Sequence, residues 1–348
     1  MKNLSEYYEH PKFEVGDDKY HLYMCSGQRG RGKTTWWLNS LSLRSVVLGS
    51  GHKFVYLRRA ETEMELALEK GLFNGCKTVE EFKPFWEKFI SYSTKNGVIS
   101  LYTEDNEKVD IGYTLTLNNI KGVSIEDADV ILFDEFVAIK RSAYKGGENG
   151  IHEPELFLRL VETIFRRRNF WAVLLGNDDT PSNPYYEYWK IPFKSEMYKD
   201  KSRGLWYEYD FSEKTAEIKN ATSLGLISKG TTYSDYSQGT KSLNEVSEDL
   251  ICDKPAHAKQ MYNIKILGNL LTVWRDENNP ILYFTDKYKY NTSCTTISVT
   301  NADMSINTDF IKYSLGFLEF MRQFYGCGRV RFSNQKVATL FTTMLSIQ

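Results

Sequence analysis

The amino-acid sequence predicts an α/β protein with a mostly parallel sheet, followed by a smaller α+β domain. Three observations predict this class. A short apolar segment runs into a glycine-rich loop, SGQRGRGKTT at residues 26–35, and a helical pattern follows it. A second apolar segment, VILFDEF at residues 130–136, contains two adjacent acids near its end. Strand-like segments alternate with amphipathic helical ones, which is typical of a parallel sheet with helices on both faces.

The expected elements of the larger domain follow from local patterns. Short apolar runs predict buried strands, and apolar residues at helical spacing predict helices. From residue 92 to 117, apolar and polar residues alternate between turn signals, which predicts an antiparallel excursion. The other expected strands cover 21–27, 53–60, 128–136 and 169–177, and the expected helices cover 34–51, 61–73, 81–90 and 154–168.

Changes in composition predict three regions. Residues 1–205 are expected to form the larger domain. Residues 206–250 are polar, rich in serine and threonine and interrupted by glycines, so we expect a connecting region with some helix. Strand-like segments return from about residue 261, and helical patterns follow at 309–325 and 336–345. Residues 251–348 are therefore expected to form the α+β domain.

Composition and charge narrow the class of protein. The chain has 348 residues, of which 41% are hydrophobic and 26% charged, as in globular proteins. Its formal net charge of −1 excludes a uniformly basic nucleic-acid-binding protein and allows only a local basic patch. The five cysteines include no CxxC pair, which argues against a zinc site and a disulfide framework. The polar N-terminal segment and the lack of a long apolar stretch lead us to expect a soluble intracellular protein.

The glycine-rich loop fits the pattern G-x-x-x-x-G-K-[ST] and predicts a site for the triphosphate of ATP. Glycines allow backbone N–H groups to turn toward a phosphate, and the N-terminal end of the following helix favours the same anion. Lys33 is expected to reach the β- and γ-phosphates, and the Thr34 hydroxyl is expected to bind Mg²⁺. The expected nucleotide-binding residues are Gly27, Gln28, Arg29, Gly30, Arg31, Gly32, Lys33, Thr34 and Thr35.

Two acids after the second apolar strand complete an expected hydrolase site. Asp134 is expected at the carboxyl end of this strand, where open α/β sheets bind ligands, and would hold Mg²⁺. Glu135 would orient and polarise the attacking water. The strand AVLLGN ends at Asn177, which would contact the γ-phosphate or the water. The alternative for Asn177 is a helix or turn cap, because asparagine is common there.

Arginines close the helix expected at residues 154–168. Arginines near a helix C-terminus favour the helix dipole, which is the structural interpretation. Three in succession exceed that need, and an arginine of one subunit can stabilise the transition state at the γ-phosphate held by the next. Arg166 is the first candidate for this trans-acting role and Arg168 is the second. Arg167 is expected to point elsewhere on the helix.

Three further basic residues have open roles. Arg58 and Arg59, at the end of the second strand, would lie near the nucleotide or at a subunit edge. Lys121 is a further candidate for a trans-acting contact. For each of them a solvated surface charge is the alternative.

Together these segments resemble the genome-packaging motor ATPases of small, short-tailed double-stranded DNA bacteriophages. The resemblance is carried, in order, by SGQRGRGKTT, FVYLRR, VILFDEF, TIFRRR and LLGN followed by NPYYEYW, over about residues 20–190. It is weaker beyond them. It implies a P-loop ATPase fold of the additional-strand, catalytic-glutamate type and a C-terminal domain similar to RNase H-type nucleases.

The resemblance also implies residue roles and partners. The residues that match the family's catalytic, magnesium-binding, sensor and trans-acting positions are Lys33, Thr34, Asp134, Glu135, Asn177, Arg166 and Lys121. Family members form a homo-oligomeric ring, usually pentameric, on the portal of an empty capsid, and use ATP and Mg²⁺ to drive double-stranded DNA inward. The implied location is the host cytoplasm, transiently docked on the procapsid and outside the mature virion. A role for a structural RNA is left open.

Two segments depart from the family pattern. AETEME follows FVYLRR and is acidic where the family can carry a DNA-facing lysine. The glycine-rich loop at residues 139–150 carries Lys140, Arg141 and Lys145, so we expect sequence-independent contacts with DNA phosphates there. A solvated surface loop is the alternative.

The acids of the C-terminal domain show no recognisable metal-binding signature. An active nuclease of this type needs a carboxylate cluster that holds two metal ions. We therefore expect a vestigial domain without cleavage activity. The acids concerned are Asp276, Asp286, Asp303 and Asp309.

Two other functions stay compatible with the sequence. One is a ring helicase or another nucleic-acid translocase. The other is a nucleotide-dependent scaffold with little turnover.

Overall fold

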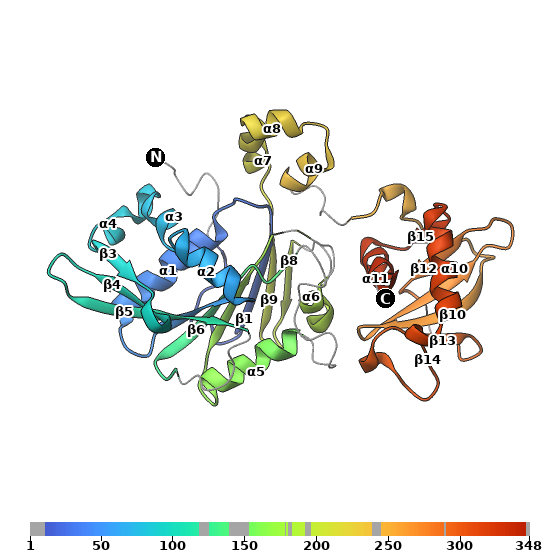
Figure 1. The fold of residues 1–348 in the computed structure, drawn as a ribbon, viewed down its shortest axis with the longest axis horizontal. Helices are drawn as coiled ribbons and strands as arrows, with labels where there is room; N and C mark the ends of the chain where they lie inside the picture. The colour runs from blue at the N-terminus through green and yellow to red at the C-terminus, as the bar shows by residue number, and fades with distance from the viewer. Residues whose placement is uncertain are drawn as a thin grey trace. The chain divides into compact units, whose positions relative to one another are not determined.

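The computed structural model describes residues 11–117, 125–138, 153–177, 179, 183–191, 196–238, 245–288 and 290–345. The chain forms two compact units, each with its own sheet and hydrophobic core (Figure 1). The first unit comprises Met1–Ile139, Pro154–Asp179 and Lys194–Lys241. The second comprises Lys140–Glu153, Thr180–Phe193 and Ser242–Gln348.

The first unit is built on a nine-stranded sheet with the order β3-β4-β5-β2-β6-β7-β1-β9-β8. The strands from β5 to β9 in this order run parallel to one another. At the two edges, the pairs β3–β4, β4–β5 and β8–β9 are antiparallel. The strands are β1 Leu22–Gly27, β2 Lys53–Arg58, β3 Ser91–Ser93, β4 Val98–Tyr102, β5 Lys108–Thr116, β6 Ala128–Asp134, β7 Trp171–Leu175, β8 Met197–Asp200 and β9 Leu205–Asp210. This arrangement confirms the predicted α/β class with a mostly parallel sheet.

The strand registers bring the functional segments to one edge of the sheet. Gly27 at the end of β1 pairs with Asp210 at the end of β9, and Asp134 at the end of β6 pairs with Leu175 at the end of β7. β7 lies between β1 and β6. The glycine-rich loop and the acidic strand are distant in sequence, yet only one strand separates them in the sheet.

Helices cover both faces of this sheet. Leu132 of β6 belongs to the core that contains Trp37 of α1 (Lys33–Leu48). Successive residues of a strand point to opposite faces, so Phe133 points away from α1. Phe133 stacks on Phe157 of α5 (Glu153–Phe165), with the ring centroids 6.0 Å apart. Therefore α1 and α5 lie on opposite faces.

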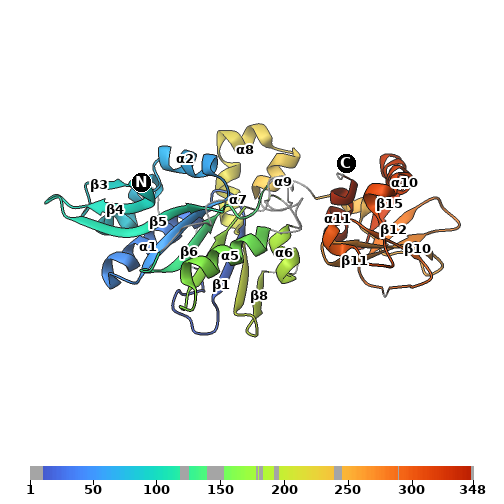
Figure 2. The same cartoon turned by 60° about the horizontal axis from the view of Figure 1, so that its bottom comes forward.

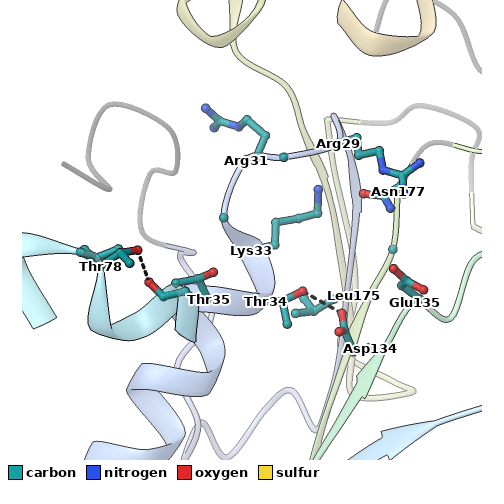
Figure 3. A pocket seen from close by; sticks show the side chains of 15 residues that line it. Arg29, Arg31, Lys33, Thr34, Thr35, Thr78, Asp134, Glu135, Leu175 and Asn177 are labelled. Carbon is teal, nitrogen blue, oxygen red and sulfur yellow. Dashed lines mark hydrogen bonds between the residues drawn. The ribbon is translucent and has the colours of Figure 1, made fainter. Parts of the chain in front are cut away.

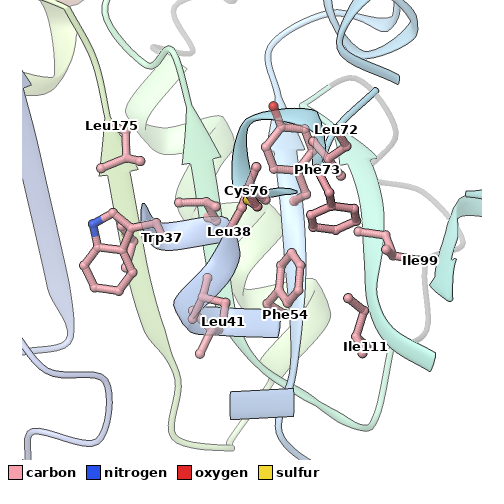
Figure 4. Close-up of a cluster of buried hydrophobic side chains, with 14 of the residues drawn as sticks. Trp37, Leu38, Leu41, Phe54, Leu72, Phe73, Cys76, Ile99, Ile111 and Leu175 are labelled. Carbon is pink, nitrogen blue, oxygen red and sulfur yellow. The ribbon is translucent and has the colours of Figure 1, made fainter. Parts of the chain in front are cut away.

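Three short helices extend the core beside α1. Phe73 and Cys76 lie with Leu38 and Leu41 of α1 in one buried cluster, near Phe54 of β2 (Figure 4). This packing fixes α3 beside α1. The helices are α2 Glu61–Glu69, α3 Asn74–Lys77 and α4 Lys83–Trp86.

The segment after β9 forms a small helical group within the first unit. It comprises α7 Glu213–Asn220, α8 Ser223–Ser228 and α9 Thr232–Gln238. The sequence predicts that the first domain ends at residue 205. In the structure β9 is part of the large sheet and the first unit extends to Lys241, so the expected boundary is too early. The aromatic residues Trp206 and Tyr207 are buried beside β1, which the polar composition of the following residues concealed.

The second unit, in which Figure 2 labels β10, β11, β12 and β15, contains a six-stranded sheet. Its strand order is β14-β13-β10-β11-β12-β15. β10, β11 and β12 are successively antiparallel, and β13 and β15 run parallel to β10 and β12. The strands are β10 Lys259–Ile266, β11 Asn269–Arg275, β12 Leu282–Thr285, β13 Thr295–Ser298, β14 Asp309–Phe310 and β15 Val330–Phe332. The α-helices are α6 Pro184–Trp189, α10 Leu315–Gly326 and α11 Gln335–Leu345. Across the described ranges of both units, every helix is too short or too polar to cross a membrane.

Short 3₁₀ helices join several of these elements. They are η2 Glu80–Phe82, η3 Lys95–Gly97, η5 Glu248–Leu250, η6 Asn301–Asp303 and η7 Ile311–Tyr313.

Candidate nucleotide site

The glycine-rich loop joins the end of β1 to the start of α1. Gly27 has φ 151°, and a Cβ there would lie 2.0 Å from the backbone oxygen of Asp210. Gly32 has φ 91° and precedes α1 without a side-chain cap. The first N–H groups of α1 are thus open to an anion, and its first turn carries no acid that would repel one. Glycine therefore allows the close approach to β9 at Gly27 and the backbone turn before α1 at Gly32.

A cavity of about 440 Å³ opens above this loop (Figure 3). It brings together residues of the loop, of the acidic strand and of the segment after β7, as the sequence predicts, and it also extends beside α3. It is lined by Arg29, Gly30, Arg31, Gly32, Lys33, Thr34, Thr35, Gly75, Thr78, Val79, Asp134, Glu135, Leu175, Gly176 and Asn177.

Lys33 is buried and lies in the cavity wall. Its Nζ donates a hydrogen bond to the Gln28 carbonyl oxygen at 2.7 Å and lies 3.8 Å from a carboxylate oxygen of Asp210. Both partners lie at the base of the loop. The ammonium group is therefore held within the loop, where a phosphate oxygen would be a charge-assisted partner.

Thr34 and Asp134 meet across the site. The Thr34 hydroxyl donates to Asp134 Oδ1 at 2.7 Å, and Tyr56 donates to Asp134 Oδ2 at 3.0 Å. A hydroxyl and a carboxylate are the oxygen ligands that Mg²⁺ accepts beside phosphate and water. This pair therefore fits a magnesium ion. Burial, followed by the charge of Asp134, raises the pKa of Tyr56, which keeps its hydroxyl a donor.

Glu135 follows directly after β6 with an unusual backbone. Its φ is +60°, in the left-handed region that few residues other than glycine adopt. This conformation turns the side chain to the cavity, where about half of its surface is exposed. Its carboxylate lies 2.8 Å from the Arg58 guanidinium.

Arg58 connects the two acids. Its guanidinium lies 3.0 Å from Asp134 and 2.8 Å from Glu135, and its Nε donates to the Tyr56 hydroxyl at 2.9 Å. Burial opposes the charged form of Arg58, but the acids and the tyrosine outweigh burial and raise its pKa. Thus Arg58 lies beside the cavity's carboxylates, and the alternative of a solvated charge is wrong.

Arg59 is also buried, on the other side of β2. It donates hydrogen bonds to the carbonyl oxygens of Glu135 at 3.2 Å and Phe136 at 2.7 Å. These contacts hold the backbone just after the acidic strand. A solvated charge is therefore wrong for Arg59 as well.

Arg31 lines the cavity, but its guanidinium points to β9 and α7. It contacts Asp210 at 2.7 Å and donates to the Thr215 hydroxyl at 2.8 Å, and only 3% of the residue is exposed. These contacts fasten the outside of the loop. The side chain of Arg31 is therefore committed to the fold of the same chain.

Asn177 lies at the cavity wall (Figure 3), two residues after the end of β7 and not within the strand as the sequence predicts. The preceding Gly176 donates its N–H to the Cys25 carbonyl oxygen at 2.9 Å, which ties this segment to β1. The amide of Asn177 therefore faces the same space as Lys33 and Glu135.

The arginines after α5 have different surroundings. Arg168 donates to the carbonyl oxygens of Ile125 at 2.6 Å and Ala128 at 3.0 Å, so its guanidinium is bound to the backbone at the start of β6 and just before it. Arg166 is exposed and has φ 54°. Among the described residues, its side chain has no hydrogen bond or ion pair. These contacts favour a structural role for Arg168 and leave Arg166 available to a partner.

Four predicted residues lie outside the described residues: Lys121, Lys140, Arg141 and Lys145. The structure also adds contacts that the motifs did not specify. Tyr56 and Arg58 pair with the acids because β2 is the neighbour of β6. Asp210 pairs with the loop because β9 is the neighbour of β1. A basic residue at the end of the second strand was a usable signal for Arg58, but no local pattern marks Asp210.

Comparisons with known proteins agree with this architecture. A family model described as Podovirus DNA encapsidation protein (Gp16) matches residues 3–346. The solved bacteriophage Phi-29 viral genome packaging motor assembly has a similar chain, with a TM-score of 0.64 and 20% identity over 94% of this chain and 96% of that one. The Phi-28 gp11 DNA packaging motor matches with a TM-score of 0.56 and 17% identity, over 95% and 96% of the two chains. At these identities the two structures establish similarity of fold. No curated protein sequence matches the chain.

Proposed function

Because the chain belongs to the podovirus DNA encapsidation protein (Gp16) family, we propose that it is an ATPase that drives double-stranded viral DNA into a preformed capsid. The observation that carries this proposal is the single cavity that joins Lys33, Thr34, Asp134 and Glu135. The cavity combines donors for a triphosphate, oxygen ligands for a metal ion and a carboxylate for water. The two solved structures compared above are described as DNA or genome packaging motors.

The topology of the first sheet supports the additional-strand, catalytic-glutamate type of P-loop ATPase. In this type a strand separates the phosphate-loop strand from the acidic strand. Here β7 lies between β1 and β6 and leads to Asn177. This arrangement supports a sensor role for Asn177, which lines the same cavity as Lys33.

In the proposed reaction the chain's own groups bind the nucleotide and orient a water molecule. The loop N–H groups and Lys33 bind the phosphates. Thr34 and Asp134 hold Mg²⁺, which neutralises phosphate charge when bound. Glu135 accepts a hydrogen bond from the attacking water and polarises it, and Asn177 positions the same water or the γ-phosphate. Before that, Glu135 must exchange its contact with Arg58 for one with water.

We assign the completing positive charge to Arg166 of a neighbouring subunit. Arg166 precedes β7, whose first residue is Trp171, whereas the cavity lies beyond the last residue of β7. A five-residue strand spans roughly 17 Å, so Arg166 lies at the opposite edge of the sheet from its own cavity. An arginine placed there serves another chain's site. This supports a homo-oligomeric ring, for which we propose five subunits.

The second unit supports a vestigial nuclease-like domain. Five of its six strands follow the order β12-β11-β10-β13-β14, with the first three antiparallel and the others parallel to β10, which is the order of the RNase H type. The sixth, β15, is added beside β12. The acids Asp276 and Asp303 bind neighbouring polar groups, and among the described residues no three acids, histidines or cysteines form a metal-binding group. We propose that this domain contacts DNA or the capsid portal and does not cleave DNA.

The remaining parts of the proposal concern partners. The loop with Lys140, Arg141 and Lys145 would grip DNA phosphates, and Lys121 would make a second trans-acting contact. The ring would dock on the portal of an empty capsid in the host cytoplasm, with or without a structural RNA. Salt-sensitive DNA binding without sequence preference is expected.

The Glu135→Gln variant tests the proposal. It should bind ATP as wild type does, because it keeps the phosphate loop, and should hydrolyse it at least about a hundredfold more slowly, because the amide cannot act as a base. Phosphate release with and without duplex DNA measures turnover, and a fluorescent ATP analogue measures binding. Lys33→Ala is the binding-deficient control.

Three outcomes separate the candidate functions. Rapid wild-type hydrolysis that duplex DNA stimulates, and that Glu135→Gln loses, supports the motor. Equal, slow turnover of both proteins indicates a nucleotide-dependent scaffold. Stimulation by single-stranded nucleic acid alone indicates a helicase.

A further inference from the structure

Lys219, in the last turn of α7, links three segments of the first unit. Its Nζ donates hydrogen bonds to the backbone carbonyl oxygen of Arg29 in the phosphate loop and to that of Ser237 in α9, the latter at 2.7 Å. The peptide of Arg29 lies between Gly27 and Lys33, and the orientation of these peptides decides which N–H groups face a bound phosphate. Lys219 thus supports the loop from its outer side.

The surroundings of Lys219 carry excess positive charge. The charged groups that face its ammonium are Arg29, Arg31, Lys33 and Asp210. Three of the four are cations, and Asp210 is already paired with Arg31 at 2.7 Å. A small cavity lies beside Lys219 and Arg29, and the titratable side chain of α9 that lines it is Tyr233. An anion bound in the loop would relieve this repulsion.

We propose that Lys219 is a positioning residue of the ATPase site, which fixes the phosphate loop through the Arg29 carbonyl and couples the charge of the bound phosphates to the packing of α7–α9. The inference rests on the nucleotide binding proposed above. With phosphates in the loop, the repulsion between Lys219 and the loop cations is offset, and the ammonium holds α7 and α9 to the loop. Without bound phosphates, the repulsion between Lys219 and the loop cations weakens the contacts of α7 and α9 with the loop.

A separate contact extends this coupling to the segment after β7. The Tyr236 hydroxyl of α9 donates a hydrogen bond to Asp179, a buried carboxylate two residues beyond Asn177. Burial, followed by the bond to Asp179, raises the pKa of Tyr236, so the phenol remains a donor. α9 therefore contacts the loop through Lys219 and the Asn177 segment through Tyr236. A change in its packing would act on both sides of the cavity.

The pH dependence of binding follows from this geometry. Burial, followed by the charges of Lys33 and Arg31, lowers the pKa of Lys219 to about 8. Bound phosphates would raise this pKa, because negative charge favours the ammonium form. Binding then takes up a proton, so affinity is fully present below the pKa of the free protein and falls as pH rises through it.

The test compares full-length wild type, K219M, K219R and K214M. Lys214 is exposed on the same helix and is the matched control. The affinity for a non-hydrolysable fluorescent ATP analogue with Mg²⁺ is titrated from below to above the pKa of Lys219. K219M should bind about tenfold more weakly below that pKa, as expected for the loss of a charged hydrogen bond. K214M should match wild type throughout.

The variant K219R separates the effect of a positive charge at position 219 from the effect of its loss at high pH. Arginine keeps the donor and stays charged at every pH used, so K219R should retain most of the affinity and lose the fall above the pKa of Lys219. Amide hydrogen exchange provides a second readout. In wild type, the amides of residues 213–238 should exchange more slowly when the analogue is bound. In K219M, their exchange rates should be the same with and without the analogue. Circular dichroism confirms that each variant is folded.

Failure of this inference is distinguishable from failure of the proposed function. If wild type binds the analogue and K219M binds it with the same affinity and pH dependence, the positioning role is overturned and nucleotide binding stands. If wild type does not bind the analogue, or Lys33→Ala leaves binding unchanged, the proposed function fails.

Discussion

At the scale of single residues, the site depends on compensated charge. Asp134 and Glu135 would repel each other and lose hydration at the strand end, and Arg58 offsets both effects by contacting the two carboxylates. The bidentate geometry of a guanidinium suits this role better than an ammonium does. The acids could be predicted from their motif. For Arg58 the sequence left a position near the nucleotide, a subunit edge and a solvated charge open, because its position depends on β2 lying beside β6.

Replacing Arg58 tests this compensation. Arg58→Ala leaves the buried Asp134 without its cation and should lower the free energy of unfolding by about 3 kcal/mol. Arg58→Lys restores the charge and should recover only part of that loss. Urea unfolding of the two variants and wild type measures the effect. Equal midpoints for Arg58→Ala and wild type would contradict the role of Arg58.

Gly27 gives a second residue-scale prediction. A Cβ at this position would lie 2.0 Å from the Asp210 carbonyl oxygen, and backbone cannot move away cheaply. Gly27→Ala should therefore lower the free energy of unfolding by at least about 3 kcal/mol and weaken nucleotide binding. Gly49→Ala is the control, since Gly49 also has a positive φ (75°) but has no atom within 4 Å of its Cβ position. Its cost should come from backbone strain alone and be smaller, about 2 kcal/mol.

At the scale of elements, α1 is anchored at both ends. Its first turn continues from the phosphate loop, and near its other end Arg44 forms two hydrogen bonds with Asp129 of β6, at 2.8 and 2.7 Å. His52, just before β2, contacts the same carboxylate at 2.8 Å. The helix is therefore fixed to the strand that carries the acids, which keeps Lys33 and Asp134 in a constant relation.

Arg44 gives the prediction at this scale. Arg44→Ala should cost about 2 kcal/mol of stability, because Asp129 is largely buried and loses both hydrogen bonds. Arg44→Lys should recover less than half of this cost, since one ammonium cannot form the paired contact. Thermal unfolding of both variants measures the costs. Full recovery by lysine would show that charge alone matters.

At the scale of the whole molecule, the proposed ring makes each site depend on two chains. Arg166→Ala should bind nucleotide normally and lose DNA-stimulated hydrolysis, whereas Arg167→Ala should retain it. A mixture of Arg166→Ala and Lys33→Ala proteins should regain activity. In that mixture some interfaces combine an intact phosphate loop with an intact arginine.

The mixing experiment has a clear contrary result. If Arg166→Ala hydrolyses ATP at the wild-type rate, or if the mixture stays as inactive as its components, Arg166 does not act in trans. Phosphate release as a function of the mixing ratio is the measurement.

The sequence by itself determined the parts of this protein that are contiguous in the chain. The glycine loop, Lys33 and Thr34, the acids after β6 and Asn177 each belong to a short pattern whose chemistry requires those residues in that order. The mostly parallel sheet followed from alternating apolar and amphipathic segments. Local patterns suffice there because backbone conformation and side-chain periodicity are local properties.

The tertiary structure alone decided which distant residues support those patterns. Arg58, Asp210 and Lys219 lie beside the site because parallel strands and helices from remote segments became neighbours. It also placed Arg31 in a buried ion pair and joined β9 to the large sheet. Strand order and register result from the packing of the whole core, and no short stretch of sequence contains that information.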